Sequence, residues 1–306
     1  MIRLKRQTTG SYTFESLYYD DDGVHVNVTT PVSIIIKDGA GATVYTGTPT
    51  IHSGHCDITL PVATLPNLDT YEFIYTAKTQ PGGADVRWTD IIELVGGHLF
   101  EIADLRAQDR AFLDTAKYPT ETLRQVRIWV EDVIEGPIAA RLAFVPRGRR
   151  VVLDGNMPDL SRAYSPVLYN NDYRNLIAPD FAIRKVNSGS INGVALTQDE
   201  IDNINVQDNV LWRNSGQYWP AWSFGVGNIK LHYEFGLDRA PGAITRAALI
   251  LAREYLVKSD LPARATATSI GDQMFRVTIA GRDGITGIPD VDAAIAQFGR
   301  TSVAIG

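Results

Sequence analysis

The strongest constraint on the fold is a change of residue pattern close to residue 97. Before it, short runs rich in β-branched and aromatic residues are separated by turn-forming glycine and aspartate. The runs are VHVNVTT (24–30), VSIIIKD (32–38), ATVYTG (42–47), CDITLP (56–61), TYEFIYTAK (70–78) and VRWTDIIELV (86–95). Val24, Val26 and Val28 alternate with polar residues, which is the period of a half-buried strand. This pattern predicts a small all-β sandwich over residues 1–97.

One short stretch refines the class of sandwich. LDTYEF (68–73) resembles the corner before a central strand of immunoglobulin-like domains, where a tyrosine hydroxyl bonds to nearby backbone. Tyr71 is the candidate for that bond, and an ordinary strand tyrosine is the alternative. We therefore expect an Ig-like sandwich.

Helical patterns begin after the domain boundary that we place at GGH (96–98), first over about 103–113. The clearest helix is YPTETLRQVRIWVEDVIEG (118–136), with Thr120 as its predicted N-cap and Gly136 at its C-terminal end. Arg127 and Glu131 are four residues apart, on the side that we predict to be polar. The apolar stripe consists of Leu123, Val126, Val130, Val133 and Ile134.

Strand-like runs return over about 143–236, and a second helix begins near Pro241 and extends to about residue 260. We expect this helix to pack on the 120–135 helix. Residues 98–262 are then predicted to be an α+β domain, a small helical core with a β-hairpin insertion. The whole chain is predicted to be multidomain, ending in an extended C-terminal arm over 263–306.

The arm contains GRDGITGIPDVDAAIAQFGR (281–300), a glycine-rich stretch before a short helix. A phosphate-binding P-loop needs Lys-Ser/Thr after its last glycine, whereas Ile288 and Pro289 follow Gly287, and the dinucleotide motif needs Gly-x-Gly. We interpret the stretch as a hinge and a helix with too little chain around it to bury its apolar face. The candidate residues for docking on a partner or a neighbouring subunit are Phe275, Val277, Ile279, Ile288, Val291, Ile295 and Phe298.

No catalytic or metal-binding pattern emerges. IHSGHC (51–56) offers His52, His55 and the single cysteine, Cys56, but no matching ligand pair follows at usable spacing, so a sandwich turn is predicted instead. In YYDDDG (18–23), tyrosine falls where a calcium loop needs a carboxylate, which indicates a solvated turn. Because no Ser-His-acid set is recognisable either, we predict no enzyme, no cofactor and no metal.

Two surface features suggest contacts with partners. The chain has a formal net charge of −6, so contact with DNA would need a local basic patch. PRGRR (146–150) is the best candidate, through Arg147, Arg149 and Arg150. The aromatic run 211–225 holds Trp212, Trp219 and Trp222, which are candidates for contacts between subunits. The alternatives are stacking on sugars or bases and packing inside their own domain.

The sequence shows no sign of export or membrane insertion. MIRLKRQTTGSYTF at the start has basic residues but no apolar core behind them, and no apolar run reaches about 18 residues. One cysteine cannot form an internal disulfide, which suits a reducing compartment. We therefore expect assembly in a cytoplasm and no membrane partner.

The order of these pieces resembles head-to-tail adaptor proteins, the connector subunits of long-tailed bacteriophages, and most of all those of actinobacteriophages. The resemblance covers about residues 99–300, and the sandwich resembles Ig-like domains that precede some such adaptors. The matching segments, in order, are YPTETLRQVRIWVEDVIEG, FVPRGRRVVLDG with a later hairpin ending WP, IKLHYEFGLDRAPGAITRAALILAREYLV, and GDQMFRVTIAGRDGITGIPDVDAAIAQF.

The resemblance implies a structural virion protein of the neck. Family members form homo-oligomeric rings, usually of twelve subunits, between the portal protein and the next stopper, connector or tail protein. Double-stranded DNA passes along the ring axis without sequence-specific contacts. The alternative function from the residues alone is a carbohydrate- or surface-binding module built on the sandwich and the tryptophan-rich loop.

Overall fold

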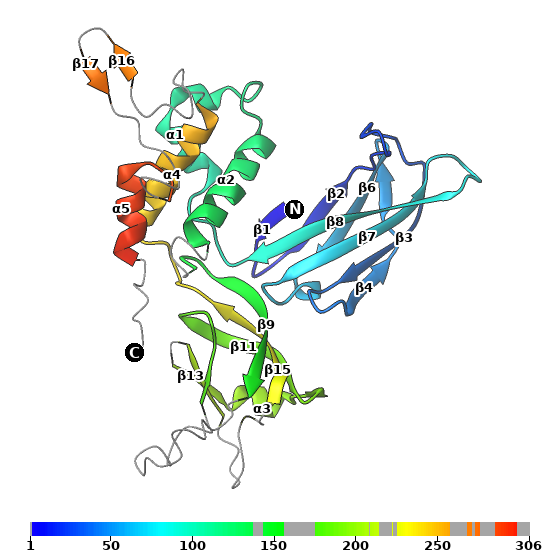
Figure 1. Ribbon diagram of the computed structural model, residues 1–306. Helices are drawn as coiled ribbons and strands as arrows, with labels where there is room; N and C mark the ends of the chain where they lie inside the picture. Colours follow the sequence, from blue (N-terminus) through cyan, green and yellow to red (C-terminus); the bar gives the residue numbers. More distant parts are fainter. Residues whose placement is uncertain are drawn as a thin grey trace, which may run out of the picture. The chain divides into compact units, whose positions relative to one another are not determined.

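The computed structural model describes residues 2–136, 143–155, 175–207, 209–213, 222, 225–257, 268–270, 273–275 and 285–298. Contacts divide the chain into two compact units (Figure 1). Unit 1 comprises Met1–Gly96, Arg147–Ala178 and Ile183–Phe235, and unit 2 comprises Gly97–Pro146, Pro179–Ala182 and Gly236–Gly306. The predicted domain limits of 1–97, 98–262 and 263–306 stay a prediction.

The N-terminal part of unit 1 contains two β-sheets. The five-stranded sheet has the order β1 (Ile2–Lys5), β8 (Asp85–Val95), β7 (Thr70–Lys78), β3 (Thr30–Lys37) and β4 (Thr43–Gly47). The three-stranded sheet has the order β2 (Ser11–Ser16), β6 (His55–Pro61) and β5 (Thr50–His52). All pairs are antiparallel except β1 with β8. The strand predicted over 24–30 is largely wrong, because β3 begins only at Thr30.

One shared core lies between these two sheets. Ile34, Ile36, Leu60 and Phe73 are fully buried in it, as the alternation of apolar residues in β3, β6 and β7 requires. The Tyr71 hydroxyl donates a hydrogen bond to the backbone oxygen of Asn67 at 3.0 Å. This bond is the one that the sequence predicted, although the Ig-like assignment itself stays a prediction.

The later part of unit 1 is a second β structure, which we call the insertion. Its four-stranded sheet has the order β12 (Val194–Ala195), β11 (Ile183–Ile191), β15 (Gly225–Phe235) and β9 (Arg147–Gly155). A three-stranded sheet has the order β10 (Asn175–Ile177), β14 (Val210–Arg213) and β13 (Ile204–Gln207), with the short helix α3 (Gln198–Asp202) before β13. Leu211, Ile229 and Tyr233 are buried in a core that includes residues of both sheets.

Unit 2 is mainly helical. It contains α1 (Ile102–Gln108), the 3-10 turn η2 (Arg110–Leu113), α2 (Thr120–Glu135), α4 (Gly242–Leu256) and α5 (Pro289–Phe298). The helix predicted over 103–113 is interrupted because Asp109 is extended, and its carboxylate accepts a hydrogen bond from the backbone N–H of Ala111. Pro119, not Thr120, is the N-cap of α2, while Gly136 is its C-cap as predicted.

The helices α1, α2, α4 and α5 share one hydrophobic core, so the predicted packing of α2 on α4 is confirmed. The polar placement of Arg127 and Glu131 is wrong, because their side of α2 is covered and both are buried. Glu131 accepts a hydrogen bond from the backbone N–H of Leu99 at 2.9 Å and lies 3.3 Å from His98 Nδ1. A buried carboxylate needs such donors in place of water.

The C-terminal helix α5 belongs to this core. Val291 and Ile295 are fully buried, and the ring of Phe298 contacts Phe144 edge-on at 5.6 Å between centroids. Ile288 is partly buried against the same core. The expectation that the apolar face of α5 lacks cover within its own chain is therefore wrong. A docking role for the arm stays a prediction.

The preceding part of the arm is described only in two short strands, β16 (Thr268–Ile270) and β17 (Gln273–Phe275), which pair antiparallel. The strand predicted over 274–280 overlaps β17 at Met274 and Phe275. Val277 and Ile279 lie outside the described residues.

We predict that Ile295→Ala will destabilise unit 2 by about 2–5 kcal/mol, because it removes methyl groups from a closed core. Urea unfolding followed by the helical circular dichroism signal measures the change. The matched control on the same helix is Gln297→Ala, at an exposed position, which should change stability by no more than about 0.5 kcal/mol. Equal stability of the two variants would contradict the burial of this face.

Candidate interaction surfaces

The four-stranded sheet of the insertion has one apolar and one polar face, because its side chains alternate. Leu231 and Tyr233 of β15 point into the core of the insertion. His232 lies on the opposite face, in register with Arg150 of β9 and Ser188 of β11. Glu234 follows two residues after His232 on the same strand. This polar face contacts the loop that precedes β7 of the sandwich, within unit 1.

Arg150 makes the central contact of this face. Its Nη2 lies 2.6 Å from Asp69 Oδ2 and 2.8 Å from Asp38 Oδ2, and its Nε lies 3.1 Å from Asp69 Oδ2. Gly148 permits this approach, because a Cβ there would collide with the backbone carbonyl of Leu68. The guanidinium is thus held by two carboxylates of the sandwich.

The three arginines of PRGRR therefore do not share one environment. Arg147 is buried, Arg149 is exposed, and Arg150 is paired with Asp69 and Asp38. The three arginines therefore do not form the single exposed phosphate-binding patch that the sequence predicted. Arg149 alone keeps an exposed position.

A second ion pair joins the same two parts of unit 1. Arg6 binds Glu234 through two hydrogen bonds, Nη1 to Oε1 at 2.7 Å and Nη2 to Oε2 at 3.1 Å. Lys185 Nζ lies 3.4 Å from the same carboxylate. Burial alone would raise the pKa of Glu234, but the hydrogen bonds and charge of Arg6, aided by Lys185, hold it below its usual value.

His232 of β15 lies directly opposite Arg150 of β9 and two residues before Glu234. Its Nε2 lies 2.9 Å from the backbone oxygen of Leu68, so this nitrogen carries the proton, and Nδ1 is buried without a hydrogen-bond partner among the described residues. Burial lowers the pKa of His232, against the opposing charge of Asp69 and the hydrogen bond to Leu68. The imidazole is thus held neutral. We call Arg6, Asp38, Asp69, Arg150, His232 and Glu234 the polar interface.

The tryptophan-rich run does not form one surface. Trp222 is 1% exposed in the core of the insertion, and its Nε1 donates to the backbone oxygen of Leu211 at 3.2 Å. The predicted contact of Trp222 between subunits is therefore wrong, and Trp222 packs within its own domain, which was the alternative prediction. Trp212 is exposed, and Trp219 lies outside the described residues.

Unit 2 carries an exposed aromatic pair that the sequence did not single out. Trp129 of α2 is 48% exposed and Tyr255 of α4 is 36% exposed, and their rings are in contact. A tryptophan beside the apolar stripe was visible in the sequence, but its partner lies more than a hundred residues away. Exposed aromatic side chains of this kind are enriched where proteins associate.

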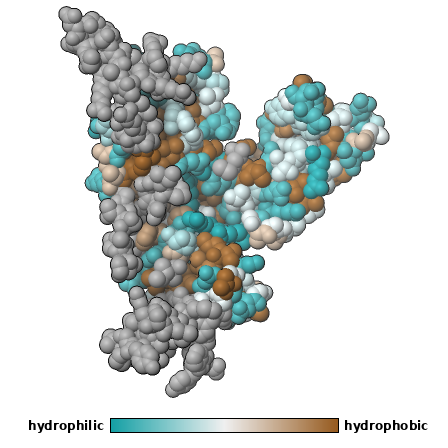
Figure 2. All heavy atoms as spheres, viewed as in Figure 1, coloured by the Kyte–Doolittle hydropathy of each residue, from teal (hydrophilic) through white to brown (hydrophobic). Residues whose placement is uncertain are grey.

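The insertion exposes aliphatic side chains as well. Val152, Val194 and Val226 are among its most exposed large hydrophobic residues. Figure 2 shows hydrophobic side chains on the surface over β9 and β15. The described surface thus offers an aromatic pair on unit 2 and separate exposed aliphatic side chains on unit 1.

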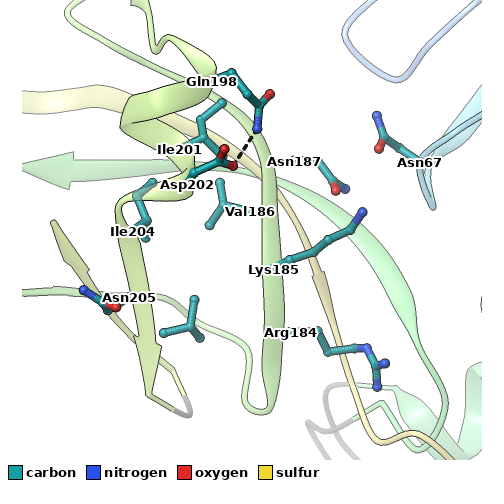
Figure 3. Close-up of a pocket in the computed structure, with 11 residues that line it drawn as sticks. Asn67, Arg184, Lys185, Val186, Asn187, Gln198, Ile201, Asp202, Ile204 and Asn205 are labelled. Carbon is teal, nitrogen blue, oxygen red and sulfur yellow. Dashed lines mark hydrogen bonds between the residues drawn. The ribbon is translucent and has the colours of Figure 1, made fainter.

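A polar pocket of about 560 Å³ lies beside β11, α3 and β13 of the insertion (Figure 3). Arg184, Lys185 and Asn187 line it from β11, and Asn67 lines it from the sandwich. The only carboxylate among its lining residues, Asp202, accepts a hydrogen bond from Gln198 at 2.7 Å. The lining residues include no histidine, cysteine or serine, so they supply no nucleophile with an adjacent base.

Two other sequence features have structural roles. The Asp20 carboxylate accepts hydrogen bonds from the backbone N–H groups of Asp22 and Val24, which is the predicted turn. Cys56 is fully buried, and burial, with the charge of Asp57, raises the pKa of its thiol to about 11. Such a thiol is inert near neutral pH.

No known family and no curated protein matches the sequence. Among solved structures, a chain of the neck of an empty GTA particle, determined with C6 symmetry, aligns with a TM-score of 0.40 and 15% identity. The alignment covers 68% of this chain and 93% of that chain. No described helix is long and apolar enough to cross a membrane.

We predict that Arg150 and Asp69 are energetically coupled by more than about 1 kcal/mol, because Asp69 is buried and loses its counter-charge when Arg150 is replaced. A double-mutant cycle with Arg150→Gln and Asp69→Asn, followed by urea unfolding, measures the coupling. The exposed pair Arg124 and Glu121 is the control, with expected coupling below about 0.5 kcal/mol. Similar values for both pairs would contradict the role of the polar interface.

The lowered pKa of His232 predicts a pH-dependent stability. Below about pH 6.5 the unfolded chain takes up a proton on His232 that the folded interface excludes. The contribution of neutral His232 to the stability of the fold is therefore complete above pH 6.5 and is lost as the pH falls below it. His232→Gln keeps a side-chain donor and cannot titrate. Its stability relative to the native chain should therefore rise as the pH falls from 7.5 to 5.5, by up to about 1.4 kcal/mol per pH unit.

Unfolding free energies measured across this pH range test the effect. His25→Gln, at an exposed position, is the control. A difference between native chain and His232→Gln that is constant with pH would show that His232 titrates alike in both states.

Proposed function

We propose that the chain is a structural neck protein of a phage-like particle, one subunit of a ring between the portal and the next connector or tail protein. The proposal is carried by one observation, the four sequence segments that resemble head-to-tail adaptors in the same order along the chain. It is a non-catalytic role, and it places the protein in the virion after assembly in the host cytoplasm.

The described architecture supports this proposal. Helices α2 and α4 lie on either side of the insertion in sequence, and both contribute to one small core, as an adaptor domain with a β insertion requires.

In the proposed ring, the exposed pair Trp129 and Tyr255 would supply a contact between neighbouring subunits. A closed ring needs a heterologous interface, in which two different patches of the chain meet. An aromatic pair already in mutual contact loses little side-chain entropy on association, so it is a favourable anchor. The actinobacteriophage type and a ring of twelve are parts of the same proposal.

The proposed ring would also form part of the DNA channel. With Arg150 held by carboxylates, Arg149 is the exposed arginine of PRGRR and the candidate that we retain for contact with phosphate or a partner. In the arm, α5 supports the helical core, so portal docking would fall on the residues before it, among them Phe275, Val277 and Ile279.

Mass photometry of the full chain, alone and with its portal protein, tests the proposal. We expect a ring-sized complex with the portal, and we expect Trp129→Ala to reduce its amount at equal subunit concentration because it removes the anchor. Gln125→Ala, also exposed on α2, is the matched control.

Circular dichroism must show that both variants are folded. Full assembly of a folded Trp129→Ala variant would contradict the subunit contact but leave the neck role intact. A chain that stays monomeric, binds glycans and does not bind the portal protein would contradict the neck role itself and favour the surface-binding alternative.

A further inference from the structure

The outer face of the three-stranded sheet in the sandwich gathers metal-ligating side chains from all its strands. Glu15 of β2 lies directly opposite Asp57 of β6, and His55 precedes Asp57 by two residues on the same face. His52 of β5 lies directly opposite His55. One ligand atom each from Glu15, His55 and Asp57 lies within 4.8 Å of the others.

From this arrangement we propose that Glu15, His55 and Asp57 form a binding site for a divalent transition metal, with zinc as its best-suited ion and His52 as a further ligand. This site has no part in the proposed neck function. The sequence did not predict it, because Glu15 lies forty residues before His55 and only strand pairing brings them together.

The distances suit a tetrahedral ion. His55 Nε2 lies 3.3 Å from Glu15 Oε1 and 3.4 Å from Asp57 Oδ1. Zinc binds nitrogen and oxygen at about 2.0–2.2 Å, so two ligands of a tetrahedron are separated by about 3.3–3.6 Å. Both separations exceed the usual length of an N–H···O hydrogen bond, so neither carboxylate holds the imidazole in a well-formed bond.

Electrostatics also favours a cation here. Two carboxylates directly opposite each other on neighbouring strands destabilise a sheet unless positive charge lies between them. A divalent ion would neutralise both. An imidazole ligand selects zinc and similar transition metals over calcium and magnesium, which prefer oxygen ligands.

The backbone holds the histidines in place. Ser53 and Gly54 form the turn between β5 and β6 with positive φ angles of 50° and 86°, which is the two-residue hairpin turn that keeps His52 opposite His55. The carbonyl of Gly54 accepts a hydrogen bond from the N–H of Val28 at 2.8 Å. The rings of His52 and His55 already lie 5.8 Å apart, centroid to centroid.

The alternative is a protonated His55 that bridges the two carboxylates as an ion pair only. Competition titration separates the two cases. The full chain is treated with a chelator, and Zn²⁺ is then added at pH 7.5 in the presence of a chromophoric chelator of known affinity. We expect saturable binding of one zinc ion per chain in the micromolar range or tighter.

His55→Ala and Glu15→Gln should each weaken zinc binding about tenfold or more. Glu15 is 63% exposed, so its variant keeps the fold even if His55→Ala does not. The exposed His25→Ala is the control and should bind zinc like the native chain. Co²⁺ should give the intense visible absorption of a four-coordinate site in the native chain, and this absorption should be lost in Glu15→Gln.

Two results would overturn the proposal. Absence of saturable zinc binding in the native chain would mean that His55 takes part in an ion pair only. Unchanged zinc affinity in both the His55→Ala and the Glu15→Gln variants would place the metal on other ligands.

Discussion

Unit 1 depends on one physical constraint, namely that a buried charge must be paired. Asp69 and Glu234 are almost fully buried, and each is paired with an arginine, Arg150 and Arg6 respectively, from the other part of the unit. Separating the sandwich from the insertion would break both pairs at once. The two parts are therefore expected to behave as one body, although some 50 residues of helical unit 2 separate them in sequence.

The helical unit obeys the complementary constraint, that an apolar helix face must be covered. Neither α2 nor α5 can bury its apolar stripe alone, and α4 supplies the surface for both. The core of unit 2 thus joins residues from before and after the insertion. In a ring subunit, the insertion could therefore vary without loss of the helical core. Packing between the helices before and after the insertion holds this core together, and the inserted chain does not.

Local periodicity explains what the sequence could predict. Strands β7 and β8 and helices α2, α4 and α5 were found because their patterns repeat within a few residues. The same alternation is present in β2, where Tyr12 and Phe14 are buried, although no strand is predicted there from the sequence. The pairing of Arg150 could not be predicted, because its partners lie 81 and 112 residues away. The predicted polar placement of Arg127 and Glu131 is wrong for the same reason, because the residues that cover them come from outside α2.

These internal pairs also bear on how the chain would meet DNA. Arg6 and Arg150 neutralise carboxylates of their own unit, so they add little to the attraction for phosphate. Among the arginines of PRGRR only Arg149 then stays exposed, in a chain with a net charge of −6. For a subunit of the proposed channel this balance is favourable, because each phosphate–cation contact strengthens non-specific binding and would slow the passage of DNA. An arginine cluster in sequence is therefore poor evidence of DNA contact until its carboxylate partners are known.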